Sequence, residues 1–246
     1  MQKVQFSDRI NLMQKVENKK TKSEVSIEDM FHAGAHYGYG KSRRHPSVSS
    51  RIYTTKNKTD IIDLEKTSID LDSAKEFVKS LGSHNKTILF VGTKPEAKEI
   101  IKNCAEALNM PYVNERWIGG TLSNFSEIKK RIFELENYKK EQKEGGLEKY
   151  TKKERTVMAK KMEKLARYYS GLISLKRLPD ALYIVDPKTE NIARTEGFKS
   201  GIPVISLTNS DSNTKDIDYP IVCNDASIPT IKLFTESISQ AYKEGQ

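Results

Sequence analysis

The chain has 246 residues but only two cysteines, Cys104 and Cys223. Two isolated cysteines cannot form a CxxC metal site or a disulfide framework, so a reducing, cytoplasmic setting is the default. No apolar run approaches the roughly 18 residues of a membrane span. The first twenty residues also lack the apolar stretch of a secretory signal. These absences disfavour a membrane protein, a secreted scaffold and a cysteine-based zinc module.

Recognisable catalytic patterns are also missing. The stretch ILFVGTKPEAKEI resembles a phosphate-binding strand, loop and helix, but it contains neither GxGxxG nor GxxxxGK[ST]. Lys94 still stands at an expected helix start, where an anion is favoured. Asp186 ends an expected strand, which is where an open α/β enzyme holds its ligand. A small-molecule enzyme built around Lys94 and Asp186 is therefore an alternative, although no nucleophile and base pair accompanies them.

Metal binding has only weak support. His32 and His36 have the i, i+4 spacing that can ligate a metal on a helix, and His45 is the other nearby imidazole. No cysteine is close and the HExxH pattern is absent. The sequence therefore predicts no metal site, with His32 and His36 as the weak candidates.

The positive charge is segregated along the chain. The net charge of +9 divides into +6 over 1–60, −1 over 61–125, +8 over 126–178 and −4 over 179–246. Clustered cations raise the local potential and release counterions when they bind phosphates. This distribution favours a polyanion-facing side, and a solvated lysine-rich helix surface is the alternative.

Short apolar runs alternate with amphipathic helical stretches. The expected strands lie at 52–55, 61–64, 87–92, 110–113, 181–186, 202–207 and 219–224. The expected helices outside the hairpin described next lie at 67–81, 93–108, 189–199 and 228–242, after a short helix capped by Ser26 and Asp29. Thr93 and Glu96 have the capping-box spacing at one of these helix starts. This alternation predicts a parallel sheet with right-handed crossovers.

The spacing of the apolar residues changes after residue 125. Apolar residues recur every three or four positions in two stretches separated by a glycine-containing turn; they are Phe125, Ile128, Ile132 and Leu135, then Met158, Met162, Leu165, Tyr169 and Leu172. This spacing predicts two antiparallel helices zipped by a seam, over about 126–144 and 151–175. Their other faces are rich in Lys and Arg, so the pair is expected to protrude.

The sequence contains a series of long motifs: AGAHYGYG (33–40), IIDLEKT (61–67), TILFVGTK (87–94), PYVNERWIGGTLSNF (111–125), YTKKE (150–154), LKRLPDALYIVDP (175–187) and GIPVISLTNSDSN (201–213). In this order and spacing they resemble the small-subunit ribosomal protein family S-two, in its bacterial or organellar form. The resemblance covers about residues 25–243.

This resemblance implies a Rossmann-like (flavodoxin-like) α/β domain with an inserted antiparallel coiled-coil hairpin. The expected division is a flexible arm at 1–24, an α/β domain at 25–125 and 176–246, and the hairpin at 126–175. The implied role is structural rather than enzymatic: binding small-subunit ribosomal RNA in the cytoplasm, beside neighbouring small-subunit proteins, with an organellar matrix left open. Neither a cofactor nor a small-molecule substrate is implied.

The chain departs from the family pattern at two features. Most members have HFGH where this chain has HYGY at 36–39, and zinc has been associated with that region in some members. Tyr39 replaces an imidazole there, which argues against zinc. The resemblance also implies the large multi-OB-fold ribosomal protein S-one as a partner, because members help to dock it. The acidic tail of some members is not found in this sequence.

Under this interpretation, the candidate RNA contacts form two groups and a few separate residues. The N-terminal group is Arg43, Arg44, Arg51 and Lys56. The hairpin group is Lys129, Lys130, Arg131, Lys152, Lys153, Lys176 and Arg177. The separate residues are Lys94, Arg116 and Trp117, of which the last two have side chains suited to a fork or stacking contact. A free coiled-coil adaptor that grips a protein partner is the remaining alternative.

Overall fold

The computed structural model describes residues 25–146 and 150–246; the predicted arm at 1–24 lies outside them. The larger of two sheets contains β4 (Ile88–Val91), β5 (Tyr112–Val113), β6 (Ala181–Val185), β7 (Val204–Thr208) and β8 (Tyr219–Val222). All neighbours in it are parallel, in the order β5-β4-β6-β7-β8. Along the chain this is the order 2-1-3-4-5, the flavodoxin-like arrangement. The predicted fold class is therefore confirmed.

Both faces of this sheet are buried. The helices are α3 (Leu64–Ser83), α4 (Pro95–Ala107), α7 (Asn191–Lys199) and α8 (Ile228–Gly245). Phe90 of β4 points into a core shared with α3, α4 and α8, whereas its neighbour Leu89 points into a second core that contains Ala193 of α7. A parallel strand buried on both sides needs apolar residues at every position, which is why the run ILFV predicts a strand so clearly.

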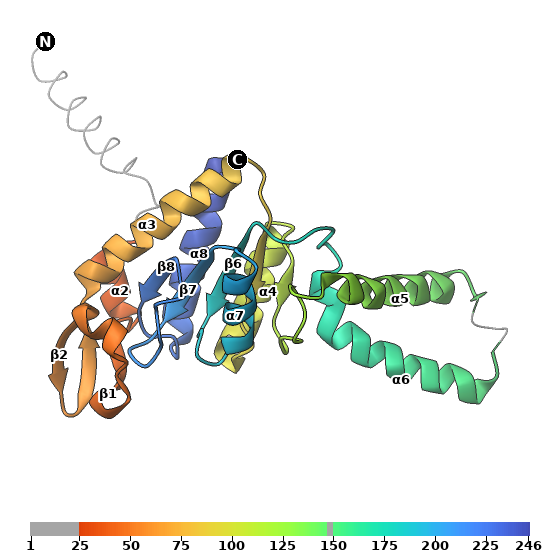
Figure 1. Ribbon diagram of the computed structural model, residues 1–246, viewed down its shortest axis with the longest axis horizontal. Helices are drawn as coiled ribbons and strands as arrows, with labels where there is room; N and C mark the ends of the chain where they lie inside the picture. Colours follow the sequence, from red (N-terminus) through yellow and green to blue (C-terminus); the bar gives the residue numbers. More distant parts are fainter. Residues whose placement is uncertain (1–24, 147–149) are drawn as a thin grey trace, which may run out of the picture.

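The hairpin extends away from the body and is made of α5 (Phe125–Lys143), α6 (Lys152–Tyr169) and the short η4 (Ser170–Leu172) (Figure 1). The predicted seam is confirmed, because Ile128, Ile132 and Leu135 of α5 are buried. Met162 and Tyr169 are buried on the facing helix. The root of this seam belongs to the same core as one face of the large sheet, so the hairpin is a continuation of the body.

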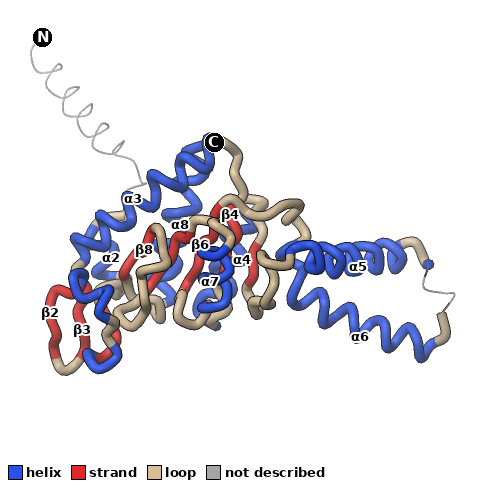
Figure 2. Tube along the Cα trace, in the orientation of Figure 1, coloured by secondary structure: helices blue, strands red, loops and turns tan. Residues whose placement is uncertain are grey.

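A small antiparallel sheet stands at the opposite end of the molecule (Figure 2). It follows α2 (Ile27–His32) and has the order β1-β3-β2, with β1 (Tyr37–Gly40), β2 (Ile52–Lys56) and β3 (Thr59–Ile62). The basic loop between β1 and β2 forms two short 3-10 helices, η1 (Lys41–Arg43) and η2 (Pro46–Arg51). Asn57 and Lys58 both have positive φ, at 51° and 62°, which is the two-residue turn that matches strand twist.

Three local predictions were incomplete or wrong. β1 was not predicted, because two of its four residues are glycine. Leu64 begins α3 rather than ending a strand, since the Asp63 side chain caps the helix there. The N-cap of α4 is Lys94, without a side-chain cap. The expected cap, Thr93, donates its hydroxyl proton to the Glu190 carboxylate instead, because a charged acceptor makes the stronger hydrogen bond. The Ser26–Asp29 capping box is confirmed.

The junction of hairpin and sheet can be tested at Gly171. A Cβ at this position would lie 2.8 Å from the Tyr112 ring and collide with the Tyr112 carbonyl oxygen on β5. Gly171→Ala is therefore expected to lower the free energy of unfolding by about 1–3 kcal/mol, measured by urea denaturation. Gly119→Ala is the matched control, since a Cβ there meets no atom within 4 Å. Equal urea midpoints for the two variants would contradict close packing at this junction.

Candidate nucleic-acid interface

Within residues 25–146 and 150–246, exposed cations are concentrated on the hairpin. We call hairpin surface the group predicted from the sequence: Lys129, Lys130, Arg131, Lys152, Lys153, Lys176 and Arg177, all of which are exposed. Three of them have acidic neighbours three residues away: Lys130 Nζ lies 2.6 Å from Glu127, Arg131 3.4 Å from Glu134 and Arg177 3.1 Å from Asp180. Such exposed pairs contribute little stability, so they do not prevent exchange of the partner for a phosphate.

The remaining hairpin cations are the more available ones. Among the residues that the structure describes, Lys129, Lys152, Lys153 and Lys176 form no ion pair. Lys152 and Lys153 lie in the first turn of α6, where the positive end of the helix dipole adds to their charge. These unpaired charges lie on helices that project from the α/β body. The hairpin is therefore well placed to contact a polyanion.

The N-terminal group divides into structural and exposed cations. Arg44 donates two hydrogen bonds to the buried Asp60 of β3, one of them at 2.7 Å from Nε, and this partner lowers the pKa of the Asp60 carboxyl. Arg51 likewise makes two bonds of 2.9 Å to Asp70 of α3. Bidentate pairs of this kind fix geometry as well as charge. Two of the four arginine and lysine candidates therefore serve the fold, because Arg44 ties the basic loop to β3 and Arg51 ties it to α3.

The other two members of this group face solvent. Arg43 is exposed, with its guanidinium carbon 5.8 Å from the centre of the Tyr39 ring. Lys56 is exposed at the end of β2. We call N-terminal basic surface the exposed pair Arg43 and Lys56. It lies at the end of the molecule opposite the hairpin (Figure 2).

Lys94 lies in a buried polar cluster at the carboxyl edge of the large sheet. Its ammonium nitrogen is 2.7 Å from Asp186 and 2.9 Å from Asp225. Burial opposes the charge of Lys94, but the two carboxylates outweigh burial and raise the pKa of the ammonium group. Asp186 has a left-handed backbone with φ of 61° and also accepts the Thr189 hydroxyl at 2.6 Å. The charge of Lys94 is thus neutralised inside the protein.

The loop that leads into the hairpin is organised by a residue that was not predicted. Glu196 of α7 is 9% exposed, and its carboxylate accepts the backbone N–H groups of Gly120 at 2.6 Å and Leu122 at 2.9 Å. The Trp117 indole N–H points to the same carboxylate at 3.5 Å, and its side chain is only 5% exposed. Trp117 is therefore a core residue of this loop, whereas Arg116 beside it is exposed.

The two weak metal candidates do not share a helix. α2 ends at His32, and the following turn separates it from His36. The His36 ring stacks on Phe31, with ring centres 4.4 Å apart, and burial lowers the pKa of its imidazole. Within the described ranges, no group of three or more His, Cys, Asp or Glu side chains is arranged to hold a metal ion.

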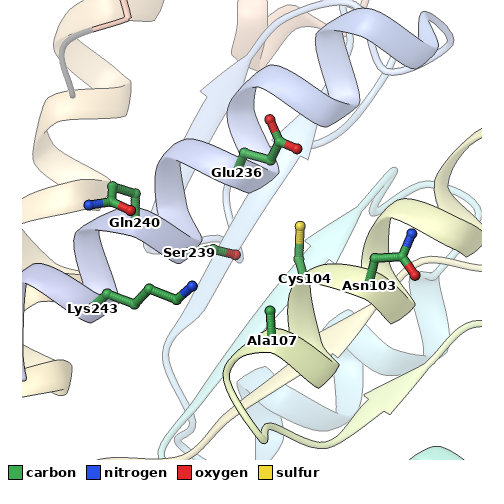
Figure 3. A pocket seen from close by; sticks show the side chains of 7 residues that line it. All are labelled: Asn103, Cys104, Ala107, Glu236, Ser239, Gln240 and Lys243. Atoms are coloured by element: carbon green, nitrogen blue, oxygen red, sulfur yellow. The ribbon is translucent and has the colours of Figure 1, made fainter. Parts of the chain in front are cut away.

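A polar cavity of about 280 Å³ lies between α4 and α8 (Figure 3). Cys104 and Asn103 line one side, and Glu236, Ser239 and Lys243 line the other. Burial raises the pKa of the Cys104 thiol, which keeps the sulfur protonated and weakly nucleophilic at neutral pH. This cavity therefore offers no activated nucleophile.

Removal of the Lys94 charge separates a structural role from an RNA-contact role. Lys94→Met leaves Asp186 and Asp225 facing each other without a cation, so we expect the free energy of unfolding to fall by about 3–5 kcal/mol. The control Lys129→Met, at an exposed site, is expected to change stability by less than about 0.5 kcal/mol. Urea denaturation measures both. An unchanged stability in Lys94→Met would show that the cluster does not depend on this cation.

Loss of the Glu196 charge tests the anchoring of the hairpin loop. Glu196→Gln places an N–H₂ group against backbone donors, so we expect the amide protons of Gly120 and Leu122 to exchange faster with solvent. Loss of charged hydrogen bonds of this kind costs about 1.5–3 kcal/mol. Hydrogen exchange followed by mass spectrometry reads residues 116–124, with 181–185 of the sheet as the internal control. Unchanged exchange in 116–124 would contradict the anchoring role.

Comparison with known proteins agrees with this geometry. The description "Ribosomal protein S2" belongs to a family profile that matches residues 30–245. The chain is also similar to the small ribosomal subunit protein uS2 of Salinibacter ruber, with 39% identity over 225 residues, which is 92% of this chain and 70% of that protein. No helix in the described part of the chain is long and apolar enough to cross a membrane. The match over nearly the whole chain shows that it belongs to the ribosomal protein S2 family, whose members are non-enzymatic ribosomal proteins.

Proposed function

We propose that this chain binds small-subunit ribosomal RNA as a structural constituent of the small ribosomal subunit, through the hairpin surface and the N-terminal basic surface. Family membership supports the setting, and the Salinibacter relative carries that subunit in its name. The observation that carries the RNA-binding role is a projecting pair of helices with exposed cations that lack an ion-pair partner among the described residues.

Recognition then depends on the shape and charge of folded RNA. The major groove of an A-form helix is too narrow for side chains, so phosphates and 2′-hydroxyls are the accessible groups. The two surfaces stand at opposite ends of the molecule (Figure 1). They therefore meet different RNA elements, and the α/β body sets the distance between them. In this proposal residues 126–175 act as an inserted RNA-contact module of the α/β domain.

The proposed set of RNA-contact residues is smaller than the set predicted from the sequence. Arg44, Arg51 and Lys94 form bidentate or buried pairs with carboxylates, and Trp117 is buried. We assign these four to folding. Phosphate contact is assigned to the exposed cations, which are Arg43, Lys56, Arg116, Lys129, Lys130, Arg131, Lys152, Lys153, Lys176 and Arg177. Neighbouring small-subunit proteins, docking of the S-one protein and a cytoplasmic location stay predictions.

The structure disfavours the alternative hypothesis of a small-molecule enzyme. Polar groups do converge near Lys94 and Asp186, as that hypothesis requires, but they neutralise one another at 2.7 Å. The small sheet also closes over this edge, since the Tyr39 backbone N–H donates to Ser210 at 2.9 Å and the His45 N–H donates to the Ser210 carbonyl. A free adaptor is disfavoured by membership of a ribosomal family.

Salt dependence tests the phosphate contacts. In a variant with Lys129→Gln, Lys152→Gln and Lys153→Gln on the hairpin surface, the plot of log affinity against log salt for small-subunit ribosomal RNA should become shallower. We expect a decrease in slope of about 0.7–0.9 for each phosphate contact that is lost. Filter binding of the full chain over a salt series measures this slope.

The matched control carries Lys102→Gln, Lys199→Gln and Lys215→Gln, three exposed lysines of the α/β body. Both triple variants lose three positive charges. A difference between their slopes therefore reflects the position of the lysines and not the total charge of the protein. Equal slopes for the two triple variants would contradict a specific role of the hairpin. Affinity of the unmodified chain that does not change with salt would contradict phosphate binding altogether.

A further inference from the structure

A cavity of about 350 Å³ opens at the root of the hairpin, between α5 and the segment after η4. Its apolar lining includes Ile132 and Leu175, which are 6% and 3% exposed, and the partly buried Ile173. Both buried residues belong to the core that joins the hairpin to the sheet, so this wall of the cavity is rigid. The volume is near the lower end of the range for small-molecule sites, enough for one planar ring system.

Phe133 is the unusual member of this lining. Its side chain is 63% exposed, although its neighbour Ile132 is buried in the hairpin seam. Phe133 therefore contributes little to the packing of α5 on α6. An exposed aromatic ring beside a concave apolar surface is the arrangement that receives another flat, apolar group.

The charges around the cavity favour an anionic partner. Lys129 and Lys176 lie on its lining, and neither forms an ion pair within the described ranges. The Lys129 ammonium lies 5.2 Å from the centre of the Phe125 ring, which holds it near the start of α5. The lining has one acidic residue, Glu136, so the local balance is positive. An aromatic wall flanked by two lysines matches a base with the phosphates on either side of it.

We propose that this cavity binds an unstacked base of ribosomal RNA, which stacks on Phe133 while its flanking phosphates meet Lys129 and Lys176. This inference rests on the proposed RNA-binding function and adds a defined site to it. Single-stranded or bulged nucleotides can present a base in this way, whereas bases inside a duplex cannot. The hairpin root thereby adds a base contact to the phosphate contacts farther out on the hairpin.

The first test is binding of the full chain to small-subunit ribosomal RNA. Phe133→Ala should weaken binding about fivefold to a hundredfold, the range found when a stacking aromatic is removed, and leave the salt slope unchanged because no charge is lost. Phe133→Trp keeps a stacking surface and should restore affinity. The matched control is Phe198→Ala, an aromatic residue on α7 with a similar exposure of 61%. Thermal unfolding of each variant shows that the fold is intact.

The second test identifies the occupant. Phe133→p-benzoylphenylalanine, incorporated into small subunits and irradiated, should form a crosslink to RNA at an unpaired nucleotide. A crosslink to a neighbouring protein instead would overturn the proposal and show that an apolar side chain fills the cavity. Equal affinities of Phe133→Ala and Phe198→Ala would also overturn it. If the base-binding site is overturned but the affinity of the unmodified chain falls steeply with salt, the proposed RNA-binding function still stands. An affinity that does not change with salt would contradict both the base-binding site and the RNA-binding function.

Discussion

The hairpin root depends on one continuous apolar core. Leu89 and Val91 of strand β4 lie in the same core as Ile128, Ile132 and Tyr169 of the hairpin. Two antiparallel helices with mostly charged outer faces have little apolar surface of their own, and the stability of such helices comes mainly from tertiary packing. Because the root is packed against the sheet, the direction of the hairpin is fixed by the body. Glu196 reinforces this constraint by binding the backbone of the intervening loop.

Burial also decides which cations are available for binding. A cation that is half buried must be paired with a carboxylate, because an unpaired charge in a low-dielectric interior is too costly. Arg44, Arg51 and Lys94 follow this rule. The exposed lysines of α5 and α6 do not need partners, since water solvates them, and they release counterions when a phosphate replaces that water. The same residue types therefore serve folding at one place and recognition at another.

The sequence predicts well the features that depend on local pattern. The apolar run of β4, the Ser26–Asp29 capping box and the hairpin seam are all set by neighbours within a few residues, and all three agree with the structure. The motifs that resemble the S-two family predict the fold class, and the strand order of the large sheet confirms it.

Features that depend on distant partners could not be predicted. Thr93 has the local signature of a helix cap, but Glu190 stands 97 residues away and captures its hydroxyl. Glu196 has no local signature at all; the one available hint was that the backbone N–H groups of a Gly-Gly loop need an acceptor. The exposed or paired state of each Lys and Arg is likewise set by tertiary contacts. Charge counting locates the basic segments but does not identify the residues in them that face RNA.

The central claim is that a rigidly rooted, cation-rich hairpin holds a folded RNA without any covalent chemistry. The most direct measurement is a cryo-electron microscopy map of the small ribosomal subunit that contains this chain. The account predicts that α5 and α6 lie along RNA, with Lys129, Lys152 and Lys153 within contact distance of phosphates. A map in which both helices point into solvent, or contact protein alone, would contradict it.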